Sequence, residues 1–342
     1  MNTTATYRMS TIITERQNVH RRNTFQPVDY TRRNTFQPVD WPTLKQQWQE
    51  EREYKNEADS VSLWSQDLVG AEEDSNYGPA EGIKRMLTVY PFRDAAWITA
   101  VAFMMGSISF IVAALFTLLP LLSASLAFEG NQTVAFPAAL TIGSAFFFIG
   151  GNLATLGAFN VGRGPEPAGE ELKKRSRYNP ALLGSKEWVW FPPWSEFKEN
   201  YLSNTAFRGG VIATLGGYVL TSSTVIGFPG ILDDKAPDFP DQIKQFVMTP
   251  LLIGASMLGL GALILTLVIQ ERWYKPAIFQ VAWHSTFWNV TGAGWLAASA
   301  ALTIIGPGFE LLSAVASVVS AMAFIIAASL QWYMLMEFYP RD

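Results

Sequence analysis

Cysteine is absent from the 342 residues, and histidine occurs only as His20 and His284. The lack of cysteine excludes disulfide bonds, a thiolate nucleophile and a cysteine-based metal site. Two histidines are too few for a typical zinc site. The sequence also contains no GxSxG, HExxH or P-loop motif, and no GxGxxG in a βαβ setting. We therefore expect no metal, no other cofactor and no enzymatic activity.

Charge is missing from long parts of the chain, although the net charge is −4 and 16% of all residues are charged. The stretch Ala95–Phe128 has no Asp, Glu, Lys, Arg or His. About 20 apolar residues in a helix already cross the ~30 Å hydrocarbon core of a bilayer. Five more apolar segments follow. We expect an all-α, multi-pass integral membrane protein with six spans at about 95–122, 134–159, 209–232, 246–270, 280–305 and 310–336.

Lysine and arginine are distributed unevenly among the segments between these spans. The segments 84–93, 160–208 and 271–279 and the C-terminal tail hold 14 of these residues, whereas 129–133, 233–245 and 306–309 hold two. Cytoplasmic loops carry the excess of positive charge. We therefore expect both termini and the 160–208 loop to be cytoplasmic. We expect the protein itself to lie in the plasma membrane or an endomembrane.

Residues 1–83 are polar and are expected to form a largely disordered cytosolic tail. The tail contains an 11-residue tandem repeat, RRNTFQPVDY at 21–30 and RRNTFQPVDW at 32–41. One interpretation is a duplication in an unconstrained segment. The other is a doubled linear motif that binds a cytosolic protein partner, because Arg-Arg-Asn-Thr resembles the target of a basophilic kinase. Thr24 and Thr35 are then candidate phosphorylation sites, where a phosphate can pair with the neighbouring arginines.

The six spans form three helical hairpins that share sequence features. Gly106 and Gly216 are 110 residues apart, and Gly143 and Gly254 are 111 residues apart. The matching offsets predict that hairpins one and two are duplicates, and the third hairpin is shorter and more diverged. Repeats of this kind are common in membrane proteins.

Small residues recur along the predicted spans at the spacing of one helix face. Helices in a bilayer associate mainly through close packing at small residues. We therefore interpret the glycines as helix-packing positions. The alternative is a pore lined by their exposed backbone. The candidates are Gly106, Gly143, Gly216, Gly217, Gly254, Gly259, Gly292 and Gly294.

Tryptophan- and proline-rich blocks carry a resemblance to a known group of proteins. They are RDAAWITAVAFMMGS at 93–107, KEWVWFPPWSEFKENYLSN at 186–204, ERWYKPAIFQVAWHSTFWNVTGAGW at 271–295 and SLQWYMLMEFY at 329–339. The chain resembles fungal integral membrane proteins of unassigned function over about 85–340, and its hairpins are similar to the YrhK-like membrane domain of bacteria. This resemblance implies a multi-span membrane protein of fungal origin. It implies no reaction, substrate or catalytic residue.

Polar residues inside the predicted spans are uncharged. Asn152, Thr221, Ser222 and Asn289 are the main candidates. One interpretation is hydrogen bonding between helices. The other is a polar seam that admits a small neutral solute.

Aromatic residues cluster where the predicted spans meet the cytosol, as in the interfacial belts of membrane proteins. The candidate interfacial anchors are Trp188, Trp190, Trp194, Trp283, His284 and Trp288. His284 has an alternative role as a proton-sensitive gate. The basic run KKRSR at 173–177 predicts binding of anionic lipid rather than nucleic acid, because the membrane holds its loop at both ends. Asn131 lies in an external Asn-Gln-Thr sequon and is a candidate glycosylation site.

The features together favour a non-enzymatic protein that organises or senses the membrane, or binds partners, through its cytosolic parts. A transporter or channel for a small neutral solute is the second hypothesis, based on the hairpin repeat and the polar residues. A reaction at the acidic segment 233–244 is the third. The sequence leaves the oligomeric state open.

Overall fold

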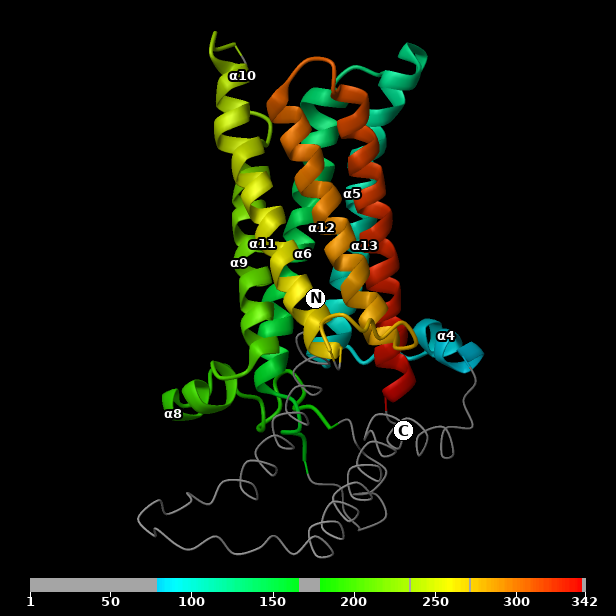
Figure 1. Cartoon of the computed structure of the whole chain (residues 1–342), viewed down its shortest axis with the longest axis vertical. Coiled ribbons are helices and arrows are strands. Elements are labelled where there is room, and N and C mark those ends of the chain that lie inside the picture. The colour runs from blue at the N-terminus through cyan, green and yellow to red at the C-terminus, as the bar shows by residue number, and fades with distance from the viewer. Residues whose placement is uncertain (1–78, 166–178, 234, 271, 340–342) are drawn as a thin grey trace, which may run out of the picture.

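The computed structural model describes residues 79–165, 179–233, 235–270 and 272–339, shown in colour in Figure 1. Every regular element in these ranges is helical, and they contain no β-strand. The chain is therefore all-helical over its described part. The tandem repeat, the candidate sites Thr24 and Thr35 and the basic run 173–177 lie outside the described residues.

Six long helices form the body of the protein. They are α5 Ala95–Leu122, α6 Phe136–Phe159, α9 Thr205–Ile226, α11 Thr249–Ile269, α12 Val281–Ile305 and α13 Glu310–Phe338. Short helices flank them, namely α4 Pro79–Thr88, α8 Trp194–Glu196 and α10 Phe239–Gln242, with 3-10 or π turns at Ala124–Leu126, Asn131–Ala135, Phe197–Tyr201 and Ile243–Met248.

Five of the long helices, all except α12, are apolar and long enough to cross a membrane. The apolar stretches run from Ala95 to Leu122, Asn131 to Phe159, Thr205 to Ile226, Phe239 to Ile269 and Glu310 to Glu337. The helix α12 is of similar length but carries His284, Asn289 and several hydroxyl residues. The helical, apolar segments indicate an integral membrane protein.

The helix α9 differs in its bounds from the predicted span at 209–232. It begins at Thr205 because the side chain of Asn204 accepts hydrogen bonds from the backbone N–H groups of Ala206 and Phe207. It ends at Ile226, where the sequence Gly-Phe-Pro-Gly follows and Gly230 adopts a φ of 84°. Hydropathy alone locates neither the Asn204 cap nor the Gly-Phe-Pro-Gly stop, since it measures apolar character and takes no account of how a helix begins or ends.

The six long helices form a closed ring in chain order. Each packs against the next, and α13 returns to pack against α5. The helices run roughly parallel to one axis, so that the N-terminal ends of α5, α9 and α12 lie at the same end of the bundle (Figure 1). One hydrophobic core cluster contains buried residues from all six helices. The ring is therefore a filled bundle with side chains along its axis.

Small residues bring paired helices into backbone contact. A Cβ added to Gly143 would lie 3.1 Å from the Gly106 carbonyl oxygen, and one added to Gly254 would lie 2.7 Å from the backbone nitrogen of Leu220. In the pair α12–α13, Ser320 Oγ donates to the carbonyl of Gly292 at 2.7 Å. Such close approach increases the dispersion contacts between two helices in lipid and allows hydrogen bonds between them.

A large buried side chain stands four residues after the small residue in each long helix. The pairs are Gly106 and Phe110, Gly143 and Phe147, Gly216 and Leu220, Gly254 and Leu258, Gly292 and Leu296, and Ser320 and Phe324. The phenyl rings in this set pack against one another, with Phe147 5.0 Å from Phe110 and 5.2 Å from Phe324 between ring centroids. At Gly106, Gly143 and Gly292 the missing Cβ makes room for a phenyl ring of the neighbouring helix. At Gly216 and Gly254 it makes room mainly for the neighbouring backbone.

We predict that Gly254→Ala lowers the stability of the bundle by about 1–3 kcal/mol, because its new methyl group meets backbone atoms that have no room to move. Thermal unfolding of the purified protein in detergent measures the effect. Gly294→Ala is the matched control, since a Cβ there has no neighbour within 4 Å. Equal unfolding temperatures for the two variants would contradict the proposed packing role.

Candidate functional site

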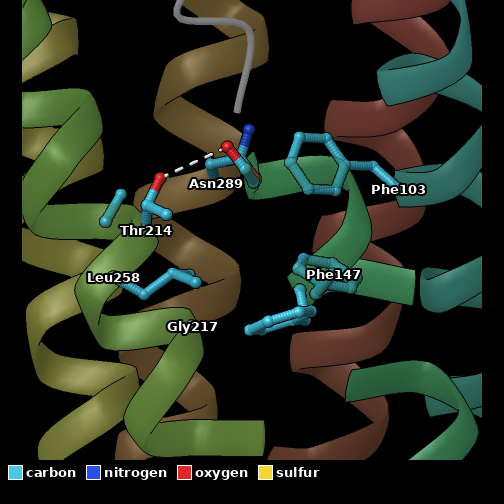
Figure 2. A pocket seen from close by; sticks show the side chains of 9 residues that line it. Phe103, Phe147, Thr214, Gly217, Leu258 and Asn289 are labelled. Atoms are coloured by element: carbon cyan, nitrogen blue, oxygen red, sulfur yellow. Dashed lines mark hydrogen bonds between the residues drawn. The ribbon is translucent and has the colours of Figure 1, made fainter. Parts of the chain in front are cut away.

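A small cavity lies near the axis of the ring, where five of the six long helices meet. Its volume is about 20 Å³. The lining residues are Phe103, Phe147, Phe148, Gly151, Ala213, Thr214, Gly217, Leu258 and Asn289. Figure 2 shows the polar groups of Thr214 and Asn289 close together, with the rings of Phe103 and Phe147 facing them. This cavity is far smaller than the ~300 Å³ at which typical small-molecule pockets begin.

The predicted polar residues do not share one surface. Asn289 is 7% exposed and lines the cavity. Asn152 and Thr221 lie between α6 and α9, where Asn152 accepts a hydrogen bond from Tyr218 and Thr221 Oγ1 donates to Ser144 O at 3.2 Å. Ser222 is exposed on the outside of α9 and donates to the carbonyl of Tyr218. The residues therefore occupy three separate environments.

The contact between α6 and α9 is a row of hydrogen bonds rather than a glycine contact. Ser144 Oγ lies 2.6 Å from Thr224 Oγ1, and Thr141 Oγ1 donates to Thr224 O at 3.0 Å. Further along, Thr155 Oγ1 lies 3.3 Å from Thr214 Oγ1. Hydrogen bonds of this kind hold membrane helices together with about 0.6 kcal/mol each. This row joins the α5–α6 hairpin to the α9–α11 hairpin.

Exposed aromatic and apolar side chains form a second feature, at the end of the bundle where α5, α9 and α12 begin. They belong to the three segments that precede these helices, and we call them the collar. The collar consists of Ile83, Leu87, Tyr90 and Phe92, then Trp190, Phe191 and Trp194, then Trp273, Tyr274, Ile278 and Phe279. Figure 1 shows α4 and α8 projecting sideways from this end. Large apolar side chains exposed in one layer mark a surface that contacts another phase or molecule.

The first collar segment is fixed to the bundle by a buried arginine. Arg85 on α4 is 8% exposed and donates to the carbonyl oxygens of Met336 at 3.0 Å and Tyr339 at 2.8 Å. These are carbonyls at the C-terminal end of α13, where a cation is favourable. The arginine holds α4 in place while Ile83 and Leu87 remain exposed.

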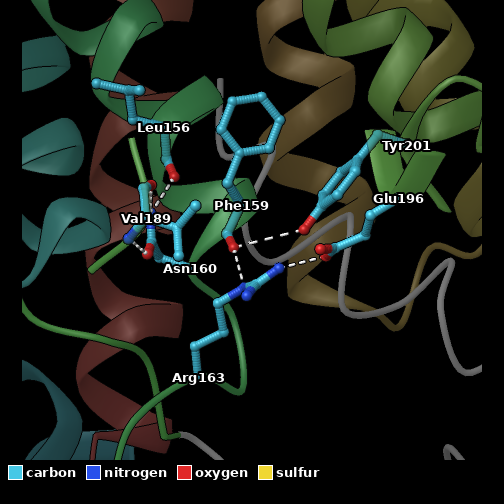
Figure 3. A network of polar contacts seen from close by, with 7 residues as sticks. All are labelled: Leu156, Phe159, Asn160, Arg163, Val189, Glu196 and Tyr201. Carbon is cyan, nitrogen blue, oxygen red and sulfur yellow. Dashed lines mark hydrogen bonds and ion pairs between the residues drawn. The ribbon is translucent and has the colours of Figure 1, made fainter. Parts of the chain in front are cut away.

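A polar network fixes the second collar segment, as Figure 3 shows. Asn160, which is 1% exposed, donates to the carbonyl of Val189 and accepts from its N–H, both at 2.8 Å. Arg163 pairs with Glu196 and donates to the carbonyl of Phe159 at 2.8 Å. Burial acts to lower the pKa of Arg163, but its hydrogen bonds to Tyr201 and Glu196 prevail and the pKa is raised. This network anchors the loop around Val189 and the helix α8 to the C-terminal end of α6.

The tryptophans of this segment fall into two groups. Trp190 and Trp194 are 65% and 66% exposed, whereas Trp188 is 8% exposed and packs against Ala95 and Ala181. Trp188 is thus a core residue of the loop rather than an interfacial anchor. The sequence could not separate the two groups, because the segment is irregular and has no helical period to assign faces.

The third collar segment contains residues that the sequence analysis did not select. Phe279 is 95% exposed and Trp273 is 80% exposed. Arg272 lies beside Tyr274, with its guanidinium donating to the phenol oxygen at 2.6 Å. The sequence feature that could have identified these residues is the combination of aromatic and basic residues before a span. The segment 188–198 has the same combination.

The interfacial anchors predicted on α12, Trp283, His284 and Trp288, make contacts within the protein and are partly or fully buried. Trp283 is 8% exposed and stacks on Phe287 with 4.9 Å between ring centroids. Trp288 is half-buried. His284 Nε2 lies 2.6 Å from the carbonyl oxygen of Ile278, so the imidazole fastens the preceding loop to the helix.

Asn131 is placed unfavourably for glycosylation. The residue is 4% exposed, and its Nδ2 donates to the carbonyl oxygen of Phe116 at 2.8 Å. Sugar attachment needs an accessible amide nitrogen. In this structure the Asn131 side chain instead ties the start of α6 to α5.

The described charges differ between the two ends of the bundle. The collar end holds nine Lys and Arg residues and six Asp and Glu residues, whereas the opposite end holds two and five. Most of the basic residues at the collar end are exposed. The collar therefore combines aromatic side chains with an excess of positive charge.

Comparisons with protein-family models, with curated proteins and with solved structures found no match to this chain.

We predict effects of very different size for two tryptophans that lie close together in the sequence. Trp188→Ala should lower the free energy of unfolding by about 3–5 kcal/mol, because it removes a buried ring. Trp190→Ala should change it by less than about 0.5 kcal/mol, because the ring is exposed. Chemical denaturation in detergent provides the measurement, and a larger loss for Trp190→Ala would contradict this assignment.

Proposed function

We propose that this chain is a non-enzymatic, six-span membrane protein that organises the membrane at its cytosolic face by binding anionic lipid through the collar. The observation that carries the proposal is the collar itself, which places exposed aromatic rings and basic side chains in one layer around a closed bundle. Aromatic rings favour the bilayer interface, and basic residues are attracted to anionic headgroups.

Support for a sixth span comes from the position of α12. The helix has 25 residues and packs lengthwise between α11 and α13. At 1.5 Å per residue its length exceeds the ~30 Å hydrocarbon core. Its polar residues Ser285, Thr286 and Asn289 are buried in the bundle, so they are shielded from lipid. A helix in this place crosses the membrane together with its neighbours.

Support for cytosolic termini comes from the charges. The excess of Lys and Arg at the collar end agrees with the positive-inside rule. An even number of spans then places both termini, and the loop between α6 and α9, on the cytosolic side. In this orientation the collar meets the leaflet that carries the anionic lipids.

Support for a threefold repeat comes from the packing positions. Gly106, Gly216 and Gly292 each occupy the close contact within a hairpin, opposite Gly143, Gly254 and Ser320. Each hairpin also follows one collar segment. Under this proposal, duplication of a hairpin with its interfacial segment produced both the ring and the collar.

We expect the double substitution Arg272→Gln and Lys275→Gln to weaken binding of phosphatidylserine by about 30-fold. Each basic residue near an anionic surface contributes about 1 kcal/mol, and about 2 kcal/mol corresponds to that factor. Quenching of tryptophan fluorescence by brominated phosphatidylserine in detergent micelles, with brominated phosphatidylcholine as reference, gives the ratio of dissociation constants.

The control is Lys235→Gln with Lys244→Gln, which removes two charges at the opposite end. This control should leave the preference for phosphatidylserine unchanged. Equal losses in both double variants, or no preference in the unmodified protein, would refute lipid binding through the collar.

A channel for a small neutral solute is the second candidate function. The observation that favours it is the position of the cavity beside the hydrogen-bonded contact of α6 and α9, since Gly151 and Thr214 belong to both. Stopped-flow light scattering of proteoliposomes under a urea or glycerol gradient decides between the two proposals. We expect proteoliposomes to have the same permeability as protein-free vesicles, because the cavity can hold about one water molecule and is too small for urea or glycerol. A rise in permeability with protein content would favour the channel.

A further inference from the structure

The cavity at the ring axis has the size and the lining of a site for one water molecule. Its volume is about 20 Å³. A cavity of at least about 10–15 Å³ can hold one water, provided that two to four polar groups line it. Truly empty cavities are lined by apolar side chains alone. The lining here includes an amide and a hydroxyl group as well as phenyl rings.

The amide belongs to Asn289, which is 7% exposed and lines the cavity. Its Nδ2 donates one proton to the carbonyl of Ser285 at 3.0 Å, and its Oδ1 is able to accept. An amide oxygen that leaves bulk water and gains no donor is costly, because it loses its hydrogen bonds. A donor in the cavity would remove this cost.

The hydroxyl group belongs to Thr214 on α9. Its Oγ1 lies 3.0 Å from the Gly210 carbonyl and 3.5 Å from the Gly151 carbonyl, the contact drawn in Figure 2. The single hydroxyl proton serves such a carbonyl, and the oxygen can still accept. Asn289 and Thr214 therefore present two acceptors to the same small volume. Water supplies two donor protons, which matches them.

The cavity exists because of one glycine. Gly217 lines it, and a Cβ added there would have no neighbour within 4 Å. The residues that follow Gly106 and Gly292 in the same way are Ser107 and Ala293, and both are fully buried. The second hairpin thus lacks a side chain that its two counterparts have. The missing methyl group accounts for the space beside Asn289.

We propose that the cavity binds a single water molecule that donates hydrogen bonds to Asn289 Oδ1 and Thr214 Oγ1. This water would link α12 to α9 across the axis, and so would connect the second and third hairpins where no direct side-chain bond joins these two residues among the described contacts. The site does not depend on lipid binding by the collar.

Gly217→Ala tests the proposal through the sign of its effect on stability. If water occupies the cavity, the new methyl group displaces it and leaves Asn289 Oδ1 without a donor, so the unfolding temperature falls. If the cavity is dry, the methyl group fills a void and replaces a helical glycine, so the unfolding temperature rises. The control Gly294→Ala adds a methyl group on the outside of α12, again with no neighbour within 4 Å. An unfolding temperature for Gly217→Ala equal to or above that of the control would overturn the proposal.

The isosteric substitution Asn289→Leu sharpens this test. It removes the acceptor, so the loss caused by Gly217→Ala should disappear in the Asn289→Leu background. A loss of the same size in both backgrounds would show a steric cause and would also overturn the proposal.

Radiolytic hydroxyl labelling of the unmodified protein gives an independent readout. Bound water generates radicals that label the side chains next to it. We expect Phe147 and Leu258, which line the cavity, to be labelled at least several-fold more than Phe324, which is also buried (2% exposed, against 8% and 5%) but lies outside the lining. Equal labelling of the three residues would contradict a water in the cavity.

Discussion

The close approach of helix backbones at small residues is the contact on which the rest of this structure depends. At Gly216 and Gly254 each residue's carbonyl oxygen would lie within 2.8 Å of a Cβ on the other. Apolar side chains gain little by leaving lipid for protein, so membrane helices need such dispersion contacts to associate. The large residue four positions later fills the space beside the neighbouring helix. Loss of the small residue therefore affects both the contact and the core.

A closed ring decides what the remaining segments can do. Three hairpins that start at the same end place three connecting segments in one layer around the bundle (Figure 1). Arg85 and Asn160 fix two of these segments by hydrogen bonds to helix ends and loop backbone. Their aromatic side chains remain outside because the interior is already filled. The proposed lipid binding follows from this rigid display of rings and positive charges.

The polar residues show where inference from one sequence stops. Asn152, Thr221, Ser222 and Asn289 are all uncharged polar residues in apolar helices, and the sequence groups them together. The structure separates them, since Ser222 is exposed and Asn289 lines the axial cavity. Whether a residue on a helix faces another helix, the cavity or the outside depends on which helices pack beside it. The sequence around these four residues does not specify which helices are neighbours.

The sequence by itself determined that the chain is helical and enters a membrane, because apolarity and the absence of charge are properties of each segment alone. It also identified Gly106, Gly143, Gly216, Gly254 and Gly292, which do lie in close contacts, but it wrongly assigned the same packing role to Gly217 and Gly294, where a Cβ would have no neighbour within 4 Å. Tertiary structure decided the order of helices around the ring, the burial of Trp188 against the exposure of Trp190, and the cavity beside Gly217. These depend on surfaces that meet only after folding. A missing methyl group on α9 matters because Asn289 on α12 lies opposite it.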